Sequence, residues 1–349
     1  MDTLTHAGAS VPIQRKDFDY QKAYPKPEDA PAFGDWLRAA LGLKSTEAAR
    51  KSLSVGDSGG QLVPEHLMGE VLAALQPATA VLRAGAGLLD LSSRSGKSFS
   101  WAAVDELPTF AWRAEGDAIG GTAPSFRLVE AVPRSIACTF TVTRELVADA
   151  SNIDAAIRGA LVQALAIAID AACLRGTGAD DDQPVGLLHH PDVVQWSLDS
   201  TGTSIAQHRF RPLLEALAGI LEDGSAFPGA AVMSPRVWAS FESLTGLDGM
   251  TPAVRPRPLE GVQMLYSAAV PVEVDDSYEV SDAFLGDWRQ MLVALREPLS
   301  VSVLTEAAAL TGELTVVAHA RLDVAVLQPK SFRVIRRLRP TYSTTTSFG

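Results

Sequence analysis

The sequence predicts an α+β fold in which a mixed α/β lobe is inserted between strand-rich parts. Three observations predict it. Residues 88–145 alternate apolar and polar side chains, which is typical of strands. Residues 152–174 carry apolar side chains at intervals of four, which predicts one long helix. From 205 to 299, helical and strand patterns follow each other in turn.

The chain begins with a polar leader of about 55 residues. Pro25, Pro27 and Pro31 are too closely spaced for a long helix. Residues 33–43 have helical spacing, but such a short helix cannot bury its apolar stripe alone, so we expect it to dock on another part. The glycine-rich stretch GDSGG at 56–60 then predicts a flexible joint.

GDSGG also surrounds the nucleophilic serine of trypsin-like proteases, which raises the hypothesis that Ser58 is a nucleophile. A serine needs a histidine as base and a carboxylate that orients the histidine. Only His6 precedes Ser58, and His319 alternates with charged residues along a predicted strand, as a solvated face would. We therefore interpret Ser58 as part of the joint, and keep a serine hydrolase as an alternative.

Residues 88–127 predict a long two-stranded hairpin. It carries Phe99 and Trp101 on one strand and Phe110 and Trp112 further out, and its turn, EGDAIGGTAPS, begins at Glu115. An isolated hairpin is marginal in water, and exposed aromatic side chains invite association. We expect a neighbouring subunit to cover these aromatic residues. Coverage by another part of the same chain is the alternative.

The hairpin leads into a strand at 135–143 and then into the long helix, which spans roughly 35 Å at 1.5 Å per residue. This helix is apolar nearly all round, so we expect it to be buried along most of its length. The run Asp180–Asp182 lacks the spacing of a calcium loop and predicts a solvated turn.

Residues 205–224 predict a helix, 229–235 a short buried strand that ends in a helix start, 236–246 a helix, and 262–271 and 283–288 strands. The loop at 247–258 is irregular and contains Pro252, Pro256 and Pro258. The basic stretch at 330–340 mixes arginines with apolar residues, which predicts a strand with solvated arginines rather than a nucleic-acid site.

The net charge of −11 argues against binding of nucleic acid through its phosphates, which needs a basic surface. No apolar signal segment is present at the amino end. Asp154, Arg158 and Asp170 interrupt the most apolar helix, so no membrane partner is expected. Cys138 and Cys173 lie in apolar runs and predict buried free thiols.

No carboxylate pair, metal-ligand spacing or nucleotide loop stands out in the sequence. We therefore predict no cofactor, no metal and no enzymatic activity. A chain with a protruding aromatic hairpin and no catalytic group is typical of a structural building block.

Several segments resemble, in the right order, the major capsid proteins of tailed bacteriophages with the Hong Kong 97-type fold. The segments are GGQLVPEHL (59–67), FAWRAEGDA (110–118), FTVTRELVADASNIDAAI (140–157), LRGTGADDDQPVGLL (174–188), AVMSPRVWASFESLTG (231–246), LEGVQML (259–265) and AFLGDW (283–288). Each is weak alone, but seven in order are specific, and the resemblance covers about 56–338.

The resemblance implies a division of the chain into the family's parts. These are an amino-terminal arm (1–58), an arm-to-body segment (59–87), an extended β-hairpin loop (88–127), a peripheral domain with a long spine helix (128–204 and 300–340), an axial α/β domain (205–299) and a carboxy-terminal tail (341–349). It implies inter-subunit contacts at the extended loop and near the symmetry axes. The candidates are Phe99, Trp101, Phe110, Trp112, Glu115, Pro252, Pro256 and Pro258.

The function implied is self-assembly through pentamers and hexamers into an icosahedral shell that encloses phage double-stranded DNA without sequence-specific binding. Implied partners are a portal protein and decoration proteins. Because only about 55 residues without heptads precede the joint, we expect either a separate scaffold or none. The implied location is the virion, with assembly in the host cytoplasm. An encapsulin-type compartment for protein cargo and a gene-transfer-particle capsid remain alternatives.

Overall fold

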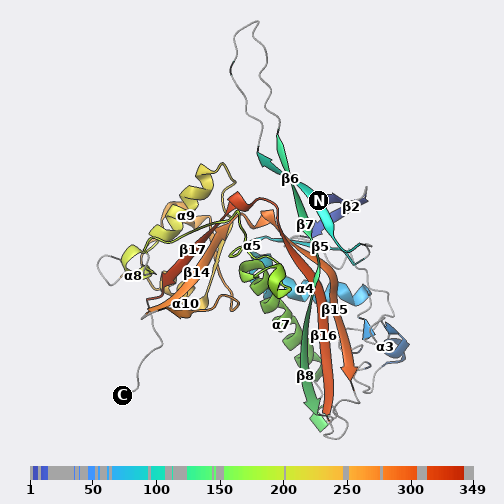
Figure 1. The fold of residues 1–349 in the computed structure, drawn as a ribbon. Helices are drawn as coiled ribbons and strands as arrows, with labels where there is room; N and C mark the ends of the chain where they lie inside the picture. The colour runs from blue at the N-terminus through green and yellow to red at the C-terminus, as the bar shows by residue number, and fades with distance from the viewer. Residues whose placement is uncertain are drawn as a thin grey trace, which may run out of the picture.

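The computed structural model describes residues 3–6, 9–14, 35, 39, 46–51, 54–55, 61–62, 65–92, 96–106, 112, 124–143, 145–146, 153–199, 202–246, 251–275, 278–304 and 313–341. Two lobes lie side by side, each built on one sheet, and a two-stranded hairpin projects from one end (Figure 1). The mixed helix and strand content predicted from the sequence is confirmed.

The first lobe contains an eight-stranded sheet in the order β1-β2-β5-β15-β16-β8, in which β4 also pairs with β15, and β3 pairs with β4. Its strands are β1 (Thr3–His6), β2 (Ala9–Gln14), β3 (Ser54–Val55), β4 (Gln61–Leu62), β5 (Gly87–Asp90), β8 (Arg134–Thr143), β15 (Met291–Leu304) and β16 (Glu313–Val326). The antiparallel pair β15–β16 forms its centre, and β5 and β4 pair with successive parts of β15.

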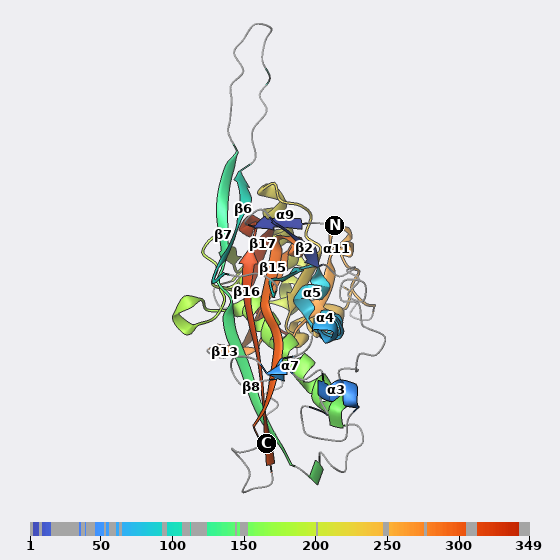
Figure 2. The ribbon, with the colours of Figure 1, turned by 90° about the vertical axis from the view of Figure 1, so that its right-hand side faces the viewer.

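The second lobe contains a seven-stranded sheet in the order β10-β17-β14-β11-β12, with β9 beside β17 and β13 beside β14. Its strands are β9 (Val194–Trp196), β10 (Thr203–Ser204), β11 (Ala230–Met233), β12 (Gln263–Tyr266), β13 (Glu273–Asp275), β14 (Tyr278–Gly286) and β17 (Phe332–Arg339). The remaining pair, β6 (Phe99–Glu106) and β7 (Ser125–Ala131), forms the projecting hairpin (Figure 2).

Helices cover both sheets. They are α3 (Glu47–Lys51), α4 (Glu65–Ala78), α5 (Ala80–Ala84), α7 (Ile153–Arg175), α8 (Ile205–His208), α9 (Arg211–Glu222), α10 (Pro235–Glu242) and α11 (Arg257–Glu260), with 3-10 turns η1 (Ala179–Asp181), η2 (Trp288–Gln290) and η3 (Pro329–Ser331). The single helix predicted at 205–224 is two helices. Pro212 has no N–H to donate to the carbonyl of His208, and Arg209 between them has a φ of 54°.

The long helix is confirmed as α7, with 23 residues. Ile157, Leu161, Leu165 and Ile169 form its buried face, but the opposite face is exposed, so the prediction of burial along most of its length is wrong. Residues 155–175 pass a length and composition test for a membrane span, as do the core helices of many water-soluble proteins. The packed face identifies α7 as a core helix.

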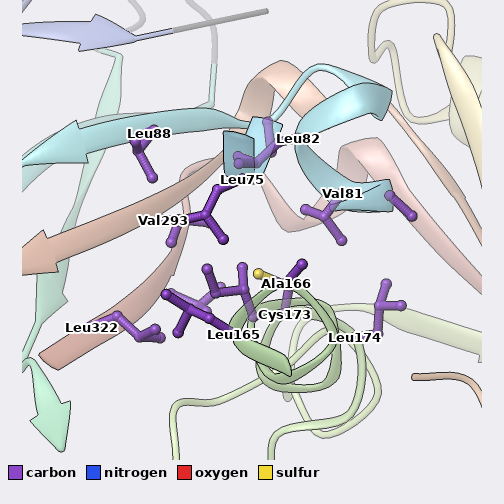
Figure 3. Packing of buried hydrophobic residues seen from close by; sticks show 14 of the residues in the cluster. Leu75, Val81, Leu82, Leu88, Leu165, Ala166, Cys173, Leu174, Val293 and Leu322 are labelled. Atoms are coloured by element: carbon purple, nitrogen blue, oxygen red, sulfur yellow. The ribbon is translucent and has the colours of Figure 1, made fainter. Parts of the chain in front are cut away.

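The largest core lies between α7 and the first sheet and continues into the second lobe. Leu165, Ala166 and Cys173 of α7 point toward Val293 of β15 and Val81 of α5 (Figure 3). The same cluster includes large side chains of the second sheet, among them Phe284, Trp288 and Phe332. The two lobes therefore share one continuous apolar core.

The strand β17 lies in the second sheet. We expected residues 300–340 to belong with 128–204. In the first sheet β16 pairs with β8, and in the second sheet β17 pairs with β14 and with β9. Within the expected range 205–299, the strand β15 begins at Met291 and belongs to the first sheet. The boundary between the lobes runs through η2 and η3, where the chain crosses between sheets.

We predicted solvated arginines on β17, and this is wrong for Arg333. Arg333 is buried, donates to the Gly219 carbonyl at 2.9 Å and pairs with Asp223. The outer arginines are also engaged. Their contacts are Arg336 with Asp282 at 3.1 Å, Arg337 with Asp275 at 2.5 Å, and the guanidinium carbon of Arg339 at 3.4 Å over the Tyr278 ring. Because β17 is an inner strand between β14 and β10, carboxylates of neighbouring elements reach these charges.

The cysteine prediction is half right. Cys173 is buried and free, whereas Cys138 is free but exposed on β8. The GDSGG stretch and Ser58 lie outside the described residues. The strands on either side of it, β3 and β4, pair antiparallel with each other.

Candidate assembly surfaces

We expected a neighbouring subunit to cover Phe99 and Trp101, but neither ring is exposed on this chain. Both are buried in the chain's own core, in a cluster with Leu89, Leu292 and Ala325 of the first sheet. The base of the hairpin lies on the outer face of that sheet, so the chain itself covers these rings. The alternative, that a part of the same chain covers them, holds for these two residues.

The opposite face of the hairpin is exposed and carries several large apolar side chains, with the charged Glu130 among them. Phe126 and Leu128 are 65% and 70% exposed, and Val104 lies directly opposite Phe126 across the strand pair. Val132 continues the line just after β7 and is also exposed. We call Val104, Phe126, Leu128 and Val132 the outer stripe. The sequence signal for it, the alternation in SFRLVEA, was present, but bulky side chains occupy both faces there and the sequence alone did not say which face is covered.

Two polar anchors fix the hairpin on the body. Arg127 donates to the carbonyls of Val326 and Leu327 at 3.1 and 3.0 Å and pairs with Asp192 at 3.2 Å. At the corner after β7, Asp323 accepts from the Val132 N–H at 2.6 Å. Burial raises the pKa of Asp323, and the backbone hydrogen bonds act in the opposite direction. These contacts attach the strand pair that carries the outer stripe to the body of the chain.

A groove of about 350 Å³ runs beside the stripe, between β7, the end of β16 and the turn at 179–191. Leu128, Val132 and Val185 give it an apolar edge, and His190 lies in it. Burial lowers the pKa of His190, and Arg127 adds to this while Asp192 opposes it.

Of the remaining hairpin candidates, Trp112 is fully exposed. Phe110 and Glu115 lie outside the described residues. Among the described hairpin candidates, Trp112 is therefore exposed to a partner, and the outer stripe is a further exposed surface that the sequence interpretation did not name.

The proline-rich loop lies at the outer end of the second lobe, next to α10. Pro252 and Pro258 are exposed and Pro256 is half-buried, while the most exposed apolar side chain is Val254, at 87%. The Ala253 N–H donates to the Leu244 carbonyl at 2.7 Å, which pins the loop to the end of α10. A groove of about 430 Å³ beside Val254 is lined in part by Phe210 and Leu214.

The turn after α7 is the most tightly packed of the predicted motifs. A Cβ on Gly176 would lie 2.2 Å from the Pro184 carbonyl oxygen, and one on Gly186 would lie 2.4 Å from the Gly176 nitrogen. His189 Nδ1 lies 3.1 Å from each of the Arg175 and Gly176 carbonyl oxygens at the helix end. Asp182 is exposed and pairs with Arg134 at 3.3 Å, as a solvated turn would.

Within the described residues, no group of three or more His, Cys, Asp or Glu side chains could hold a metal ion. Ser300, His319 and Glu297 do meet on β15 and β16, with His319 Nδ1 2.6 Å from Ser300 Oγ and His319 Nε2 3.1 Å from Glu297 Oε1. His319 is thus half-buried rather than on a solvated face, which corrects that prediction. Ser300 is about 1% exposed and pairs with Leu62 of β4, so a substrate cannot reach its hydroxyl.

The described residues thus form a two-lobed body with a projecting hairpin, whose outer face exposes Phe126 and Leu128. The model of the phage capsid family matches residues 59–336, so the chain belongs to that family, and the predicted resemblance is confirmed. The chain is a major capsid protein, a component of a symmetric particle shell.

Solved structures agree in fold. The capsid of a native GTA particle matches with a TM-score of 0.56 at 17% identity, covering 74% of this chain and 90% of that one. The Mycobacterium phage Adephagia protein matches with a TM-score of 0.56 at 16% identity, covering 76% and 91%. The Microbacterium phage Oxtober96 protein matches with a TM-score of 0.52 at 19% identity, covering 74% and 90%. Among curated proteins, none matches the chain by sequence.

Proposed function

We propose that this protein assembles through hexamers and pentamers into an icosahedral shell that encloses phage double-stranded DNA. The observation that carries the proposal is the outer stripe. Phe126 and Leu128 are large apolar side chains held in water on a strand pair that projects from the body. Exposed apolar surface of this kind marks an interaction site, and in a shell the surface that covers it belongs to a neighbouring subunit.

We assign the parts of the Hong Kong 97-type fold according to the two sheets, and not according to the ranges expected from the sequence. We assign the first lobe, with α7 as spine helix, to the peripheral domain, and the second lobe, including β9 and β17, to the axial domain. The hairpin beyond β6 and β7 is the extended loop, with Trp112 as a contact. Val254 joins Pro252, Pro256 and Pro258 as the candidate contact near the symmetry axes.

The charges of the protein are consistent with a shell that does not attract DNA electrostatically. The net charge is −11, and Arg333, Arg336 and Arg337 of β17 pair with carboxylates of the same chain. Genome entry then needs work from outside, which is the role of a packaging motor at a portal protein. We propose no enzymatic activity, no sequence-specific DNA contact, assembly in the host cytoplasm, and help from a separate scaffold and decoration proteins.

A gene-transfer-particle capsid is the second candidate, because a GTA capsid is among the matched structures. An encapsulin-type compartment is a third. The contents of the particle separate the three: a phage genome, packaged host DNA or a cargo protein.

The test is electron cryo-microscopy of the protein expressed alone and together with its neighbouring genes. We expect closed shells with five-fold and six-fold clusters. A subunit that stays monomeric in both preparations contradicts the proposal. DNA-filled particles formed without any packaging motor would contradict the proposed role of the net negative charge.

A further inference from the structure

The strand β8 is an open sheet edge of unusual length. It has ten residues, Arg134–Thr143, and pairs with β16 over ten consecutive positions without a shift in register. Within the part of the chain that the structure describes, no strand pairs with its other side. Every second residue of such an edge turns its N–H and C=O groups outward.

Proteins that stay monomeric protect long edges with prolines, bulges or charges. The sequence of β8, RSIACTFTVT, contains no proline, and its only charge is Arg134 at the first position. Its exposed side chains are small and neutral, namely Ser135, Ala137, Cys138, Thr139, Thr141 and Thr143. The edge is therefore regular, uncharged and sterically open to another strand.

We propose that, in the assembled shell, an extended segment of a second copy of this chain adds to β8 as a further strand. This inference rests on the proposed shell function. It is an example of β-strand addition to an exposed sheet edge. In this kind of contact, main-chain hydrogen bonds hold the partner and alternate side chains set the register.

A second copy is the occupant because the edge continues the outer stripe and its groove, the surface that we assign to a neighbouring subunit. β7 runs into β8 through Val132 and Pro133, and the two strands follow one another along one side of the molecule (Figure 2). Leu128, Val132 and Arg134 line the same groove at this junction. The neutrality of β8 also offers nothing to a charged partner such as DNA.

The test is hydrogen exchange of the same protein in two states, the unassembled folded subunit and the purified shell. In the subunit, alternate amides of β8 exchange fast because they point outward, while the amides of β15 and β16 are protected. In shells grown from this protein alone, the fast amides of β8 should slow by at least about tenfold. The amides of β15 and β16 serve as the internal control.

A pair of variants adds a genetic test. Thr139→Lys with Thr141→Lys places charges on the edge, and we expect a folded subunit whose shell yield falls at least about tenfold. Thr139→Val with Thr141→Val keeps strand propensity without charge and should assemble normally.

The outcomes separate the two proposals. Absence of any shell from the wild-type protein, with or without its neighbouring genes, refutes the shell function. Shells in which the amides of β8 exchange as fast as in the subunit overturn the strand addition alone. Protection that appears only when another protein is present assigns the edge to that protein and overturns the second copy as occupant.

Discussion

Asp170 of α7 accepts a hydrogen bond from Ser267 Oγ at 2.7 Å, and this bond joins the first lobe to the second. The same carboxylate accepts from the N–H groups of Ala80 and Val81 at 3.0 and 3.1 Å, at the first turn of α5. Asp170 is buried, and all its partners come from other elements. One side chain thus fixes α7, α5 and the loop after β12 against one another.

Replacing this carboxylate should loosen the joint between the lobes. We expect Asp170→Ala to lower the free energy of unfolding of the subunit by about 2–4 kcal/mol, because two helix-start N–H groups and one hydroxyl lose their buried partner. Ser267→Ala removes only the bond between the lobes and should cost about 1–2 kcal/mol. Urea unfolding measures both. Equal losses in the two variants would show that the α5 contacts contribute nothing.

The same residue predicts a pH dependence. Burial raises the pKa of Asp170 above its ordinary 3.8, although hydrogen bonds from Ser267, Val81 and Ala80 oppose the shift. A raised pKa in the folded state means that the contribution of this group to stability is present below the ordinary pKa. It is lost as the pH rises from about 3.8 through the raised value.

Asp170→Asn does not titrate, so it should gain stability relative to the wild type across that pH window. Other groups with shifted pKa, such as Asp323, are common to both proteins and cancel in the difference. Unfolding midpoints at a series of pH values give the measurement. A difference that shrinks with rising pH would mean that the hydrogen bonds outweigh burial and lower the pKa of Asp170.

The turn after α7 predicts that Gly176→Ala and Gly186→Ala each destabilise the subunit by at least about 2 kcal/mol, because a new Cβ meets main-chain atoms that have no room to move. Gly159 in the same helix is the matched control. It is exposed, and a Cβ there meets nothing within 4 Å, so Gly159→Ala should stabilise by about 0.5–1 kcal/mol. Thermal unfolding of the three variants decides; a stable Gly176→Ala would contradict the packing of this turn.

Local patterns predicted most of the elements. The four-residue spacing from Ile157 to Cys173 marks α7, and the Ser-Pro pair at 234–235 marks the start of α10, where Ser234 Oγ accepts from the Val237 N–H. Both signals depend on neighbours in the sequence. Such signals are legible because the same residues form the element and its cap.

Pairings between residues far apart in the chain could not be predicted from the local sequence. Nothing within residues 330–340 says that β17 lies between β14 and β10 and that Asp223, Asp275 and Asp282 neutralise its arginines. The same holds for the hairpin. Alternation shows that Trp101 and Leu128 face opposite sides, but only the position of the first sheet decides which side is buried. The sequence interpretation placed the contact on the wrong face for that reason.

The two faces of the hairpin give the sharpest test of the assembly surface. Phe126→Asp with Leu128→Asp changes only exposed side chains of the outer stripe, so the subunit should fold with a stability within about 1 kcal/mol of the wild type. Particle yield should fall at least about tenfold, because a charged strand cannot be desolvated against a neighbour. Sedimentation of the soluble fraction measures the yield.

Trp101→Asp is the matched variant on the covered face. Trp101 is buried against the first sheet, so a carboxylate there should cost more than about 4 kcal/mol and leave no folded subunit. The two variants thus separate assembly from folding within one strand pair. Normal shells from the Phe126→Asp and Leu128→Asp variant would remove the outer stripe from the interface, and a folded Trp101→Asp subunit would show that the base of the hairpin does not lie on the sheet.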